Sequence, residues 1–430
     1  FKSEVCTMNI AHYISQHFKI NQALVEFVFD CEREVKDIFN GFADIAQINQ
    51  FRVIEAFQKS NISARHFYAS TGYGYGDEGR EKLNRVFADT FGAEDAIVSP
   101  MLMSGTHAIS TALFGLLRPG DTLFSVTGKP YDTLISTLYG ASGSLNEYNI
   151  DFDCTPLKAD GSIDIKNAIQ KIKATPSVKV IYFQRSTGYE IRAAFTTDAL
   201  SQAIAAIRAE LSDIIIMVDN CYGEFVCAEE PTAIGADVIA GSLIKNPGGG
   251  IAPTGGYIAG KSEYIKKIAG RFSAPGIGTE IGSYAFGYQQ YYQGFFMAPH
   301  TVCQALQGVA LAARVFERLG YKTQPAYNAV RGDITQSIIF GSEEPMTGFV
   351  RGIQRASAID GYVVPYAWDM PGYDDKVIMA AGTFVQGASI ELTADGPIRP
   401  PYAAYLQGAL TYEHAKLGIL YALNDMNINI

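Results

Sequence analysis

The most informative stretch of the chain is Asp237-Val-Ile-Ala-Gly-Ser-Leu-Ile-Lys-Asn-Pro-Gly-Gly-Gly-Ile251. A short apolar strand leads into Ser242 and Lys245, and the loop that follows is too rich in glycine to continue as helix or strand. A lysine directly after such a strand is poorly placed for a solvated surface charge. It is well placed to form a Schiff base with an aldehyde cofactor. Lys245 is therefore the first candidate site residue, with a surface lysine at a loop edge as the alternative.

The composition excludes several classes of protein. The chain has 430 residues, 48% of them hydrophobic and 18% charged, which indicates a folded protein of more than one domain. The net charge of −10 argues against nucleic acid as a partner, and the apolar runs are too short to span a membrane. The six cysteines lack the spacing of a zinc site or a disulfide framework. We therefore expect no metal and a reducing, cytoplasmic location.

Residues 95–260 show the pattern that defines the fold class. Short β-rich apolar runs alternate there with helical stretches, and the runs lie at residues 96–98, 122–126, 178–183, 214–218, 238–240 and 256–259. This alternation predicts a mostly parallel sheet covered by helices on both faces, a three-layer αβα domain. In such sheets a ligand binds outside the carboxyl ends of the strands.

The flanking segments differ from this pattern. Residues 8–60 are predicted to be helical, with one apolar face formed by Ile45, Ile48, Phe51, Ile54 and Phe57. A smaller α+β unit follows from about residue 331, with strands expected at 335–340, 376–379 and 388–392 and a helix at about 402–424. The predicted organisation is a helical arm over residues 1–60, a large domain over 61–325 and a small α+β domain over 326–430.

Two polar features fall at expected strand ends. The turn Met103-Ser-Gly-Thr-His107 offers hydroxyls and N–H groups at a helix N-terminus, which suits an anion such as a phosphate or serves simply as an N-cap. Asp219 ends the most apolar strand, where a carboxylate is costly unless it is paired. Beside a pyridine nitrogen it would keep that nitrogen protonated; otherwise it caps the next turn.

Ser242 and Tyr131 extend the same pattern. Ser242 lies just before Lys245 and could reach a phosphate, while burial among apolar neighbours is expected to lower the pKa of that lysine. Tyr131 follows the strand at 122–126 and could stack on a pyridine ring or belong to the core. Together these residues would supply what pyridoxal 5'-phosphate (PLP) needs.

In order and spacing these features resemble the fold-type I PLP enzymes and, within them, the lyases of cysteine and methionine metabolism. The chain is most similar to the bacterial family named for aluminium resistance, also described as methionine gamma-lyase or cystathionine beta-lyase family proteins. The resemblance covers nearly the whole chain and includes Tyr73-Gly-Tyr-Gly-Asp-Glu-Gly-Arg80, Gln184-Arg-Ser-Thr-Gly-Tyr189 and the segment from Ala381 to Tyr402. It implies an aspartate aminotransferase-like large domain.

The resemblance also implies roles for individual residues. Lys245 would hold PLP, Asp219 would pair with its ring nitrogen and Tyr131 would stack on the ring. Arg399 would hold the substrate carboxylate, with Arg185 as the second candidate. Arg185 or Ser186 would replace the strand-end asparagine that bonds the cofactor hydroxyl in related lyases. The phosphate would be bound by Ser104, Gly105, Thr106 and Ser242.

A loop departs from the family pattern. Better-known lyases complete the phosphate site with a Tyr-x-Arg segment from a neighbouring subunit, but here the stretch is Tyr73-Gly-Tyr75 and the arginine is missing. Tyr73 and Tyr75 thus both remain candidates for the acid at this site, and Tyr73 would also contact the substrate. The resemblance implies a homo-oligomer, a dimer or tetramer whose active sites are shared between subunits.

The implied activity is a carbon–sulfur lyase acting on a sulfur-containing amino acid. Lys245 would remove the Cα proton, and a thiol would then leave from Cβ or Cγ. Amino transfer or aldol cleavage would use the same core site, so another fold-type I activity is an alternative. A PLP-binding stress or metal-resistance protein with little turnover is a third interpretation.

Overall fold

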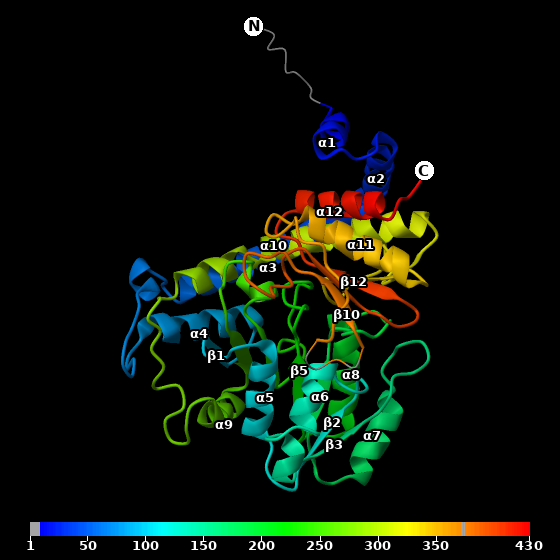
Figure 1. The fold of residues 1–430 in the computed structure, drawn as a ribbon. Coiled ribbons are helices and arrows are strands. Elements are labelled where there is room, and N and C mark those ends of the chain that lie inside the picture. Colours follow the sequence, from blue (N-terminus) through cyan, green and yellow to red (C-terminus); the bar gives the residue numbers. More distant parts are fainter. Residues whose placement is uncertain (1–8, 371–372, 374) are drawn as a thin grey trace.

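The computed structural model describes residues 9–370, 373 and 375–430, and it contains two sheets joined through one long helix (Figure 1). Residues 1–8 of the predicted helical arm lie outside the described residues. The larger sheet has the strand order β1-β7-β6-β5-β4-β2-β3, and only β7 runs against the others. Its strands are β1 (Asp95–Ser99), β2 (Thr122–Ser125), β3 (Asp151–Cys154), β4 (Val178–Gln184), β5 (Ile215–Asp219), β6 (Val238–Ser242) and β7 (Gly256–Gly260).

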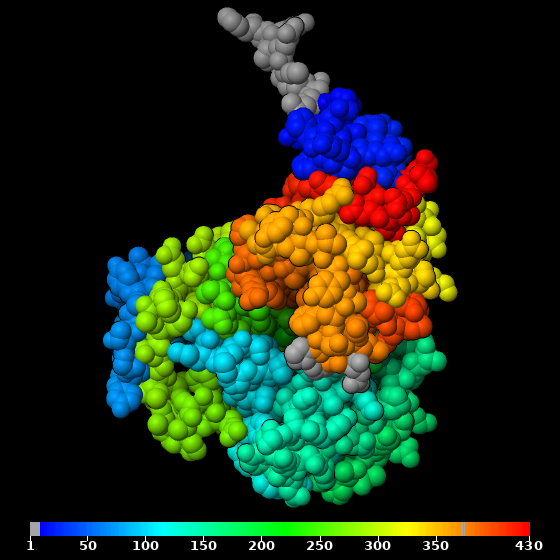
Figure 2. All heavy atoms as spheres, viewed as in Figure 1, coloured from blue at the N-terminus to red at the C-terminus, as the bar shows by residue number. Residues whose placement is uncertain are grey.

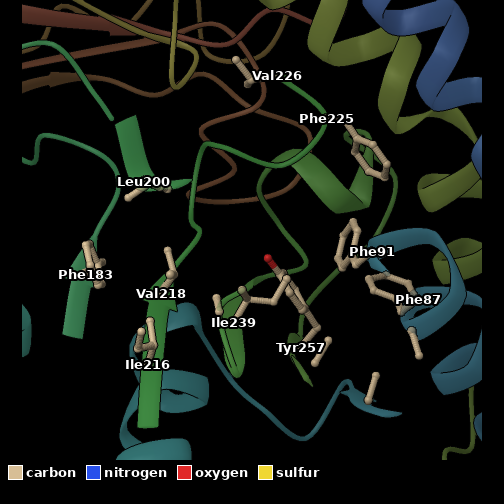
Figure 3. Close-up of a cluster of buried hydrophobic side chains, with 14 of the residues drawn as sticks. Phe87, Phe91, Phe183, Leu200, Ile216, Val218, Phe225, Val226, Ile239 and Tyr257 are labelled. Carbon is tan, nitrogen blue, oxygen red and sulfur yellow. The ribbon is translucent and has the colours of Figure 1, made fainter. Parts of the chain in front are cut away.

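Helices cover both faces of this sheet, because side chains of a strand alternate between its two sides. In β4, Ile181 and Phe183 join one buried cluster while Val180 and Tyr182 join the other. Figure 3 shows the first cluster, where Phe87 packs near the sheet.

Three helices pack in the second cluster, which contains Val180 and Tyr182: α5 (Gly105–Leu116), α6 (Asp132–Leu138) and α9 (Ser262–Phe272). The first contains residues of α4 (Glu78–Phe91), α7 (Ile165–Ala174), α8 (Thr197–Glu210) and α10 (Gln289–Arg318). The expected three-layer αβα fold is therefore confirmed.

The smaller sheet is antiparallel, with the order β10-β11-β12-β9-β8. Its strands are β8 (Lys322–Gln324), β9 (Thr335–Ile339), β10 (Val377–Ala380), β11 (Thr393–Pro397) and β12 (Ala403–Gln407). It shares a third buried cluster with part of α10 and with α11 (Glu343–Ala356), α12 (Tyr412–Asp425), α1 (Ile10–Phe18) and α2 (Gln22–Glu34). Figure 2 shows the N-terminal helices in blue beside the red C-terminal helix, so the two ends of the described chain meet.

Two predicted elements of the smaller sheet are wrong. Residues 388–392 form a turn, not a strand, because the Glu391 carboxylate accepts the backbone N–H groups of Phe384 and Val385 and closes the chain on itself. The strand begins only at Thr393. The helix expected from about residue 402 begins at Tyr412, and the residues before it form β12.

The apolar stripe predicted for the arm is also wrong. In α3 (Lys36–Lys59), Ile48 and Phe51 are 49% and 63% exposed, whereas Val53 and Ala56 are buried. An α-helix turns every 3.6 residues, so residues spaced strictly by three wind around it and cannot stay on one face. Among the described residues, no helix combines the length and apolar character needed to cross a bilayer.

Candidate active site

A cavity of roughly 430 Å³ lies at the carboxyl ends of β4, β5 and β6, where a parallel sheet usually binds its ligand. Residues of both sheets line it, so the wall opposite the large sheet comes from the small one. The cavity brings together most of the predicted site residues: Ser104, Gly105, Thr106, Tyr131, Ser186, Asp219, Ser242, Lys245 and Arg399.

The N-terminus of α5 forms the polar floor of the cavity. Ser104 is the N-cap and accepts the N–H of His107 at 3.0 Å. Because the helix begins at Gly105, the N–H groups of Gly105 and Thr106 have no partner within the helix and are free to bind an anion. A Cβ on Gly105 would lie 3.1 Å from the Cys221 sulfur, so glycine lets this terminus approach β5 and β6 closely.

Asp219 lies at the end of β5 with both carboxylate oxygens engaged. Its Oδ1 accepts the N–H of Cys221 at 3.1 Å, and its Oδ2 accepts the Tyr182 hydroxyl at 3.2 Å. Burial raises the pKa of Asp219, while the charge of Lys245 and these hydrogen bonds act in the opposite direction. These two hydrogen bonds thus fix the orientation of a carboxyl that lines the cavity.

Lys245 lies in the loop after β6, just before the short 3₁₀ helix Asn246–Gly248, and its Nζ lies 3.9 Å from the centre of the Tyr222 ring. Tyr222 has a φ of 71°, a left-handed conformation that costs about 1–3 kcal/mol for a residue other than glycine. The expected lowering of the lysine pKa is wrong. Burial on its own lowers the pKa of Lys245, but the acidic groups of Cys221, Tyr222 and Asp219 outweigh it and raise the pKa above its ordinary value.

Tyr131 and Gln184 form a second wall. The Tyr131 hydroxyl lies 3.0 Å from Oγ1 of Thr106, and burial raises the pKa of this phenol, which keeps it neutral. Gln184 accepts the backbone N–H of Tyr131 through Oε1 at 2.8 Å and donates to the Ser186 carbonyl at 3.1 Å. Gln184 was not among the predicted site residues, although its position as the last residue of β4 was a usable signal.

Arg399 reaches the cavity from the segment after β11. Its Nη1 lies 2.7 Å from Oδ2 of Asp375, and its side chain is 45% exposed. A partly exposed guanidinium at a cavity wall retains donors for a carboxylate, and a bidentate pair is the strongest form of such binding. This placement suits the expected role of Arg399 toward a substrate.

Arg185 lies elsewhere, contrary to the prediction that it contacts the cofactor or the substrate. Its side chain is fully buried behind the strand ends, outside the cavity lining. Nη1 donates to Asn220 Oδ1 at 2.7 Å and lies 3.7 Å from Glu230, and Nε donates to the Phe195 carbonyl at 3.2 Å. Arg185 therefore fixes the loop after β5 and has no free donor directed at the site.

Tyr73 and Tyr75 do not line this chain's own cavity. Their side chains are 68% and 71% exposed, and the two rings lie 5.4 Å apart on the surface. The loop is held by the N–H of Gly282, which donates to the Tyr73 carbonyl at 2.9 Å, and by Ser283, which donates to the Gly72 carbonyl at 2.8 Å. Two ordered, exposed tyrosines are available to a second molecule.

The residues of the cavity fit PLP. An anion site at the start of α5, a fixed carboxyl at the end of β5 and a lysine after β6 match its phosphate, its ring nitrogen and its aldehyde. We find no group in the cavity lining that would conflict with such a ligand.

The fold of this chain is similar to that of solved PLP-dependent proteins. The PLP-dependent protein YhfS of Escherichia coli superposes with a TM-score of 0.60 at 17% identity, covering 88% of this chain and 95% of that one. This likeness shows a fold-type I architecture. The pattern of the methionine gamma-lyase family matches residues 24–427, and the chain belongs to that family.

Relatives at higher identity agree with this assignment. YnbB of Bacillus subtilis (strain 168) is 47% identical over 409 residues, which are 94% of this chain and 97% of that protein. A carbon–sulfur lyase involved in aluminum resistance from Clostridium novyi NT is 44% identical with a TM-score of 0.93, covering 97% and 99% of the two chains. A distant relative, L-methionine gamma-lyase of Porphyromonas gingivalis (strain ATCC BAA-308 / W83), is 26% identical over 46% of this chain and 45% of its own. The resemblance drawn from the sequence is confirmed.

Proposed function

We propose that the protein is a PLP-dependent carbon–sulfur lyase of the cystathionine beta-lyase or methionine gamma-lyase type. The observation that carries the proposal is the meeting of Lys245, Asp219 and the start of α5 in one cavity. Family membership and the name of the C. novyi relative support a lyase over the other reactions that this cofactor permits.

The cofactor would be held at three points. Its phosphate would accept the free N–H groups of Gly105 and Thr106 and hydroxyls such as that of Ser242. Lys245 would hold the aldehyde carbon covalently, and Tyr131 would cover the ring. When bound, PLP supplies an electron sink that accepts the electron pair of the substrate Cα–H bond.

The chain's own residues would handle the proton and the substrate. Arg399 would bind the α-carboxylate, and Lys245 Nζ would remove the Cα proton. Asp219 would favour the protonated, positively charged form of the cofactor's ring nitrogen. In a substrate whose sulfur is on Cβ, the carbon–sulfur bond would then break with its electron pair on sulfur, and Lys245 would return a proton to the leaving thiolate. A sulfur on Cγ would leave only after a proton had also been removed from Cβ. Water would complete the conversion to a thiol, a keto acid and ammonia.

The function is tested by product analysis together with reductive trapping. We expect the holoenzyme to release thiol, keto acid and ammonia in equal amounts from L-cystathionine or L-methionine. Borohydride should fix the cofactor to the peptide that contains Lys245. Transfer of the amino group to an added keto acid without thiol release would contradict a lyase and indicate an aminotransferase.

We also propose that Tyr73 and Tyr75 serve the active site of a second copy of the chain. Their exposure on an ordered loop and their absence from this chain's own cavity support this arrangement, and sharing of sites requires a symmetric dimer or a larger assembly.

A mixing experiment tests the shared site. Lys245→Ala and a Tyr73→Ala/Tyr75→Ala double variant should each be nearly inactive alone. After random subunit exchange, half of the dimers would be mixed and would each carry one intact site, restoring about a quarter of wild-type activity. Absence of any recovery, despite exchange confirmed by native mass spectrometry, would place both tyrosines in the site of their own chain.

A further inference from the structure

Tyr222 adopts a backbone conformation that its residue type disfavours. Its φ of 71° is in the left-handed region, where a side chain is strained. Such residues persist only where the surrounding structure holds them, and they gather at functional sites. Tyr222 lines the cavity, and the centre of its ring lies 3.9 Å from Lys245 Nζ. The strained conformation therefore places an aromatic face against the lysine of the site.

Asn246, which directly follows Lys245 in the chain, holds Tyr222 in this conformation. Its side chain is fully buried, and its Nδ2 donates to the carbonyls of Tyr222 and Glu224, each at 2.9 Å. Both hydrogens of the amide are thus used on the loop that carries Tyr222. Because Asn246 and Lys245 are adjacent, these bonds tie the position of the ring to the position of the lysine.

Arg185 holds the same loop on either side of Tyr222. Its Nη1 donates to Asn220 Oδ1 at 2.7 Å, and its guanidinium occupies the space beside Gly223, where an added Cβ would lie 2.5 Å from Nη1. The N–H of Gly223 also donates to the Asn220 carbonyl at 2.9 Å. The residues before and after Tyr222 are therefore fixed, which lets the loop keep one strained residue between them.

The face of an aromatic ring attracts a cation that lies within about 6 Å of its centre, and the distance from Lys245 Nζ to the Tyr222 ring is well inside this range. The attraction acts on the protonated amine and not on the neutral one. It strengthens where water is excluded. A contact that stabilises the protonated form makes the amine a stronger base.

Several acidic groups also face Lys245, but burial raises the pKa of each of them and so favours their neutral forms. They are Tyr131, Asp219, Cys221 and Glu224. A ring face, by contrast, attracts a cation without having to ionise. The contribution of the Tyr222 ring therefore does not depend on the protonation of these neighbours.

We propose that Tyr222 is a positioning residue whose ring face holds the protonated amine of Lys245 within the cavity, and that Asn246 keeps this ring in place. The inference rests on the proposed function, in which Lys245 Nζ takes the Cα proton. The ring would stabilise the ammonium group that this proton transfer creates. The strain at Tyr222 is then part of the site and not a defect of the loop.

The first measurement does not require turnover. Full-length protein without cofactor is acylated over a range of pH, and mass spectrometry follows the modification of Lys245. Only the neutral amine reacts, so the pH dependence of the rate gives the pKa of this lysine. Tyr222→Leu should lower that pKa by about one pH unit, which corresponds to about tenfold faster acylation at a given pH below it.

Conservative variants separate the ring face from the rest of the side chain. Tyr222→Phe keeps the ring and should stay within about twofold of the wild-type rate. Phenylalanines with one, two or three ring fluorines at this position should lower the pKa in steps, because fluorine withdraws negative charge from the ring face. This series hardly changes the shape of the residue, so it keeps the test decisive if Tyr222→Leu fails to fold.

Two further variants complete the design. Asn246→Ala removes both hydrogen bonds to the loop and should shift the pKa of Lys245 in the same direction by a smaller amount. The matched control is Tyr264→Leu, because the Tyr264 ring lies 5.1 Å from Lys267 Nζ and outside the cavity lining. It should leave the acylation of Lys245 unchanged.

An unchanged pKa of Lys245 in Tyr222→Leu would overturn the inference. An equal effect of Tyr222→Phe and Tyr222→Leu would also overturn it, since the hydroxyl and not the ring face would then be responsible. In the holoenzyme, the acid limb of kcat against pH should move to lower pH in Tyr222→Leu. A shift in the acylation profile without thiol release from any substrate would uphold this role of Tyr222 and reject the lyase activity instead.

Discussion

Replacing Lys245 with alanine is expected to lower kcat by about 10³-fold or more. The variant loses both the covalent attachment of the cofactor and the base that removes the Cα proton, and a positioned general base alone contributes about 10²- to 10⁴-fold. The neighbouring Cys221 does not offer a substitute base, because burial raises the pKa of its thiol. Stopped-flow and steady-state assays of thiol release measure the loss.

The control for this variant is Lys166→Ala, a change of the same kind at an exposed position of α7. It should keep wild-type turnover and should still be trapped by borohydride on Lys245. Small primary amines added to Lys245→Ala should restore part of the rate, because they replace the missing base. Wild-type turnover by Lys245→Ala would refute the proposed role.

Asp219→Asn is expected to reduce kcat by about 10²-fold while the protein still folds. Removing one preorganised charge from a dry site typically has an effect of this size. Asparagine has nearly the same shape and can still accept the N–H of Cys221, so the end of β5 should be preserved. The free energy of unfolding should change little, since burial already opposes the charged form of this carboxyl.

A comparison of Asp219→Asn with Tyr182→Phe distinguishes the effect of the carboxylate's charge from the effect of its orientation. Tyr182→Phe removes one hydrogen bond to Asp219 and keeps its charge, so kcat should fall only about threefold to tenfold. Kinetics and urea unfolding are measured on both variants. If Tyr182→Phe proved as damaging as Asp219→Asn, orientation and not charge would be the contribution of this carboxyl.

Much of the large domain could be predicted because its signal is local. A run of β-branched residues ending in Val218-Asp219 defines both a buried strand and a polar strand end, and parallel strands bring such ends to one edge. The same argument placed Lys245, Ser242 and the turn at Gly105 in one cavity. The exposed edge strand β3 was missed because its side chains alternate without strong apolar character.

Other features depend on contacts between distant segments. Gln184 and Arg185 are adjacent, yet one faces the cavity and the other faces the core, because side chains of neighbouring residues in an extended chain point in opposite directions. The direction in which the pKa of Lys245 shifts depends on Asp219, Cys221 and Tyr222. These residues are distant in the sequence, so no local pattern around the lysine reveals their effect.

The register between β4 and β5 determines whether a newly folded molecule can form its cofactor site. Gln184 lies opposite Asp219, and the preceding residues Phe183 and Val218 are buried in the core. A slip of one residue would turn the carboxylate toward the helices and push apolar groups into the cavity. A molecule with this register error could not bind PLP and would lack the yellow colour of the bound cofactor. The yellow fraction of freshly made protein would therefore report the fraction of molecules in which β4 and β5 are correctly paired.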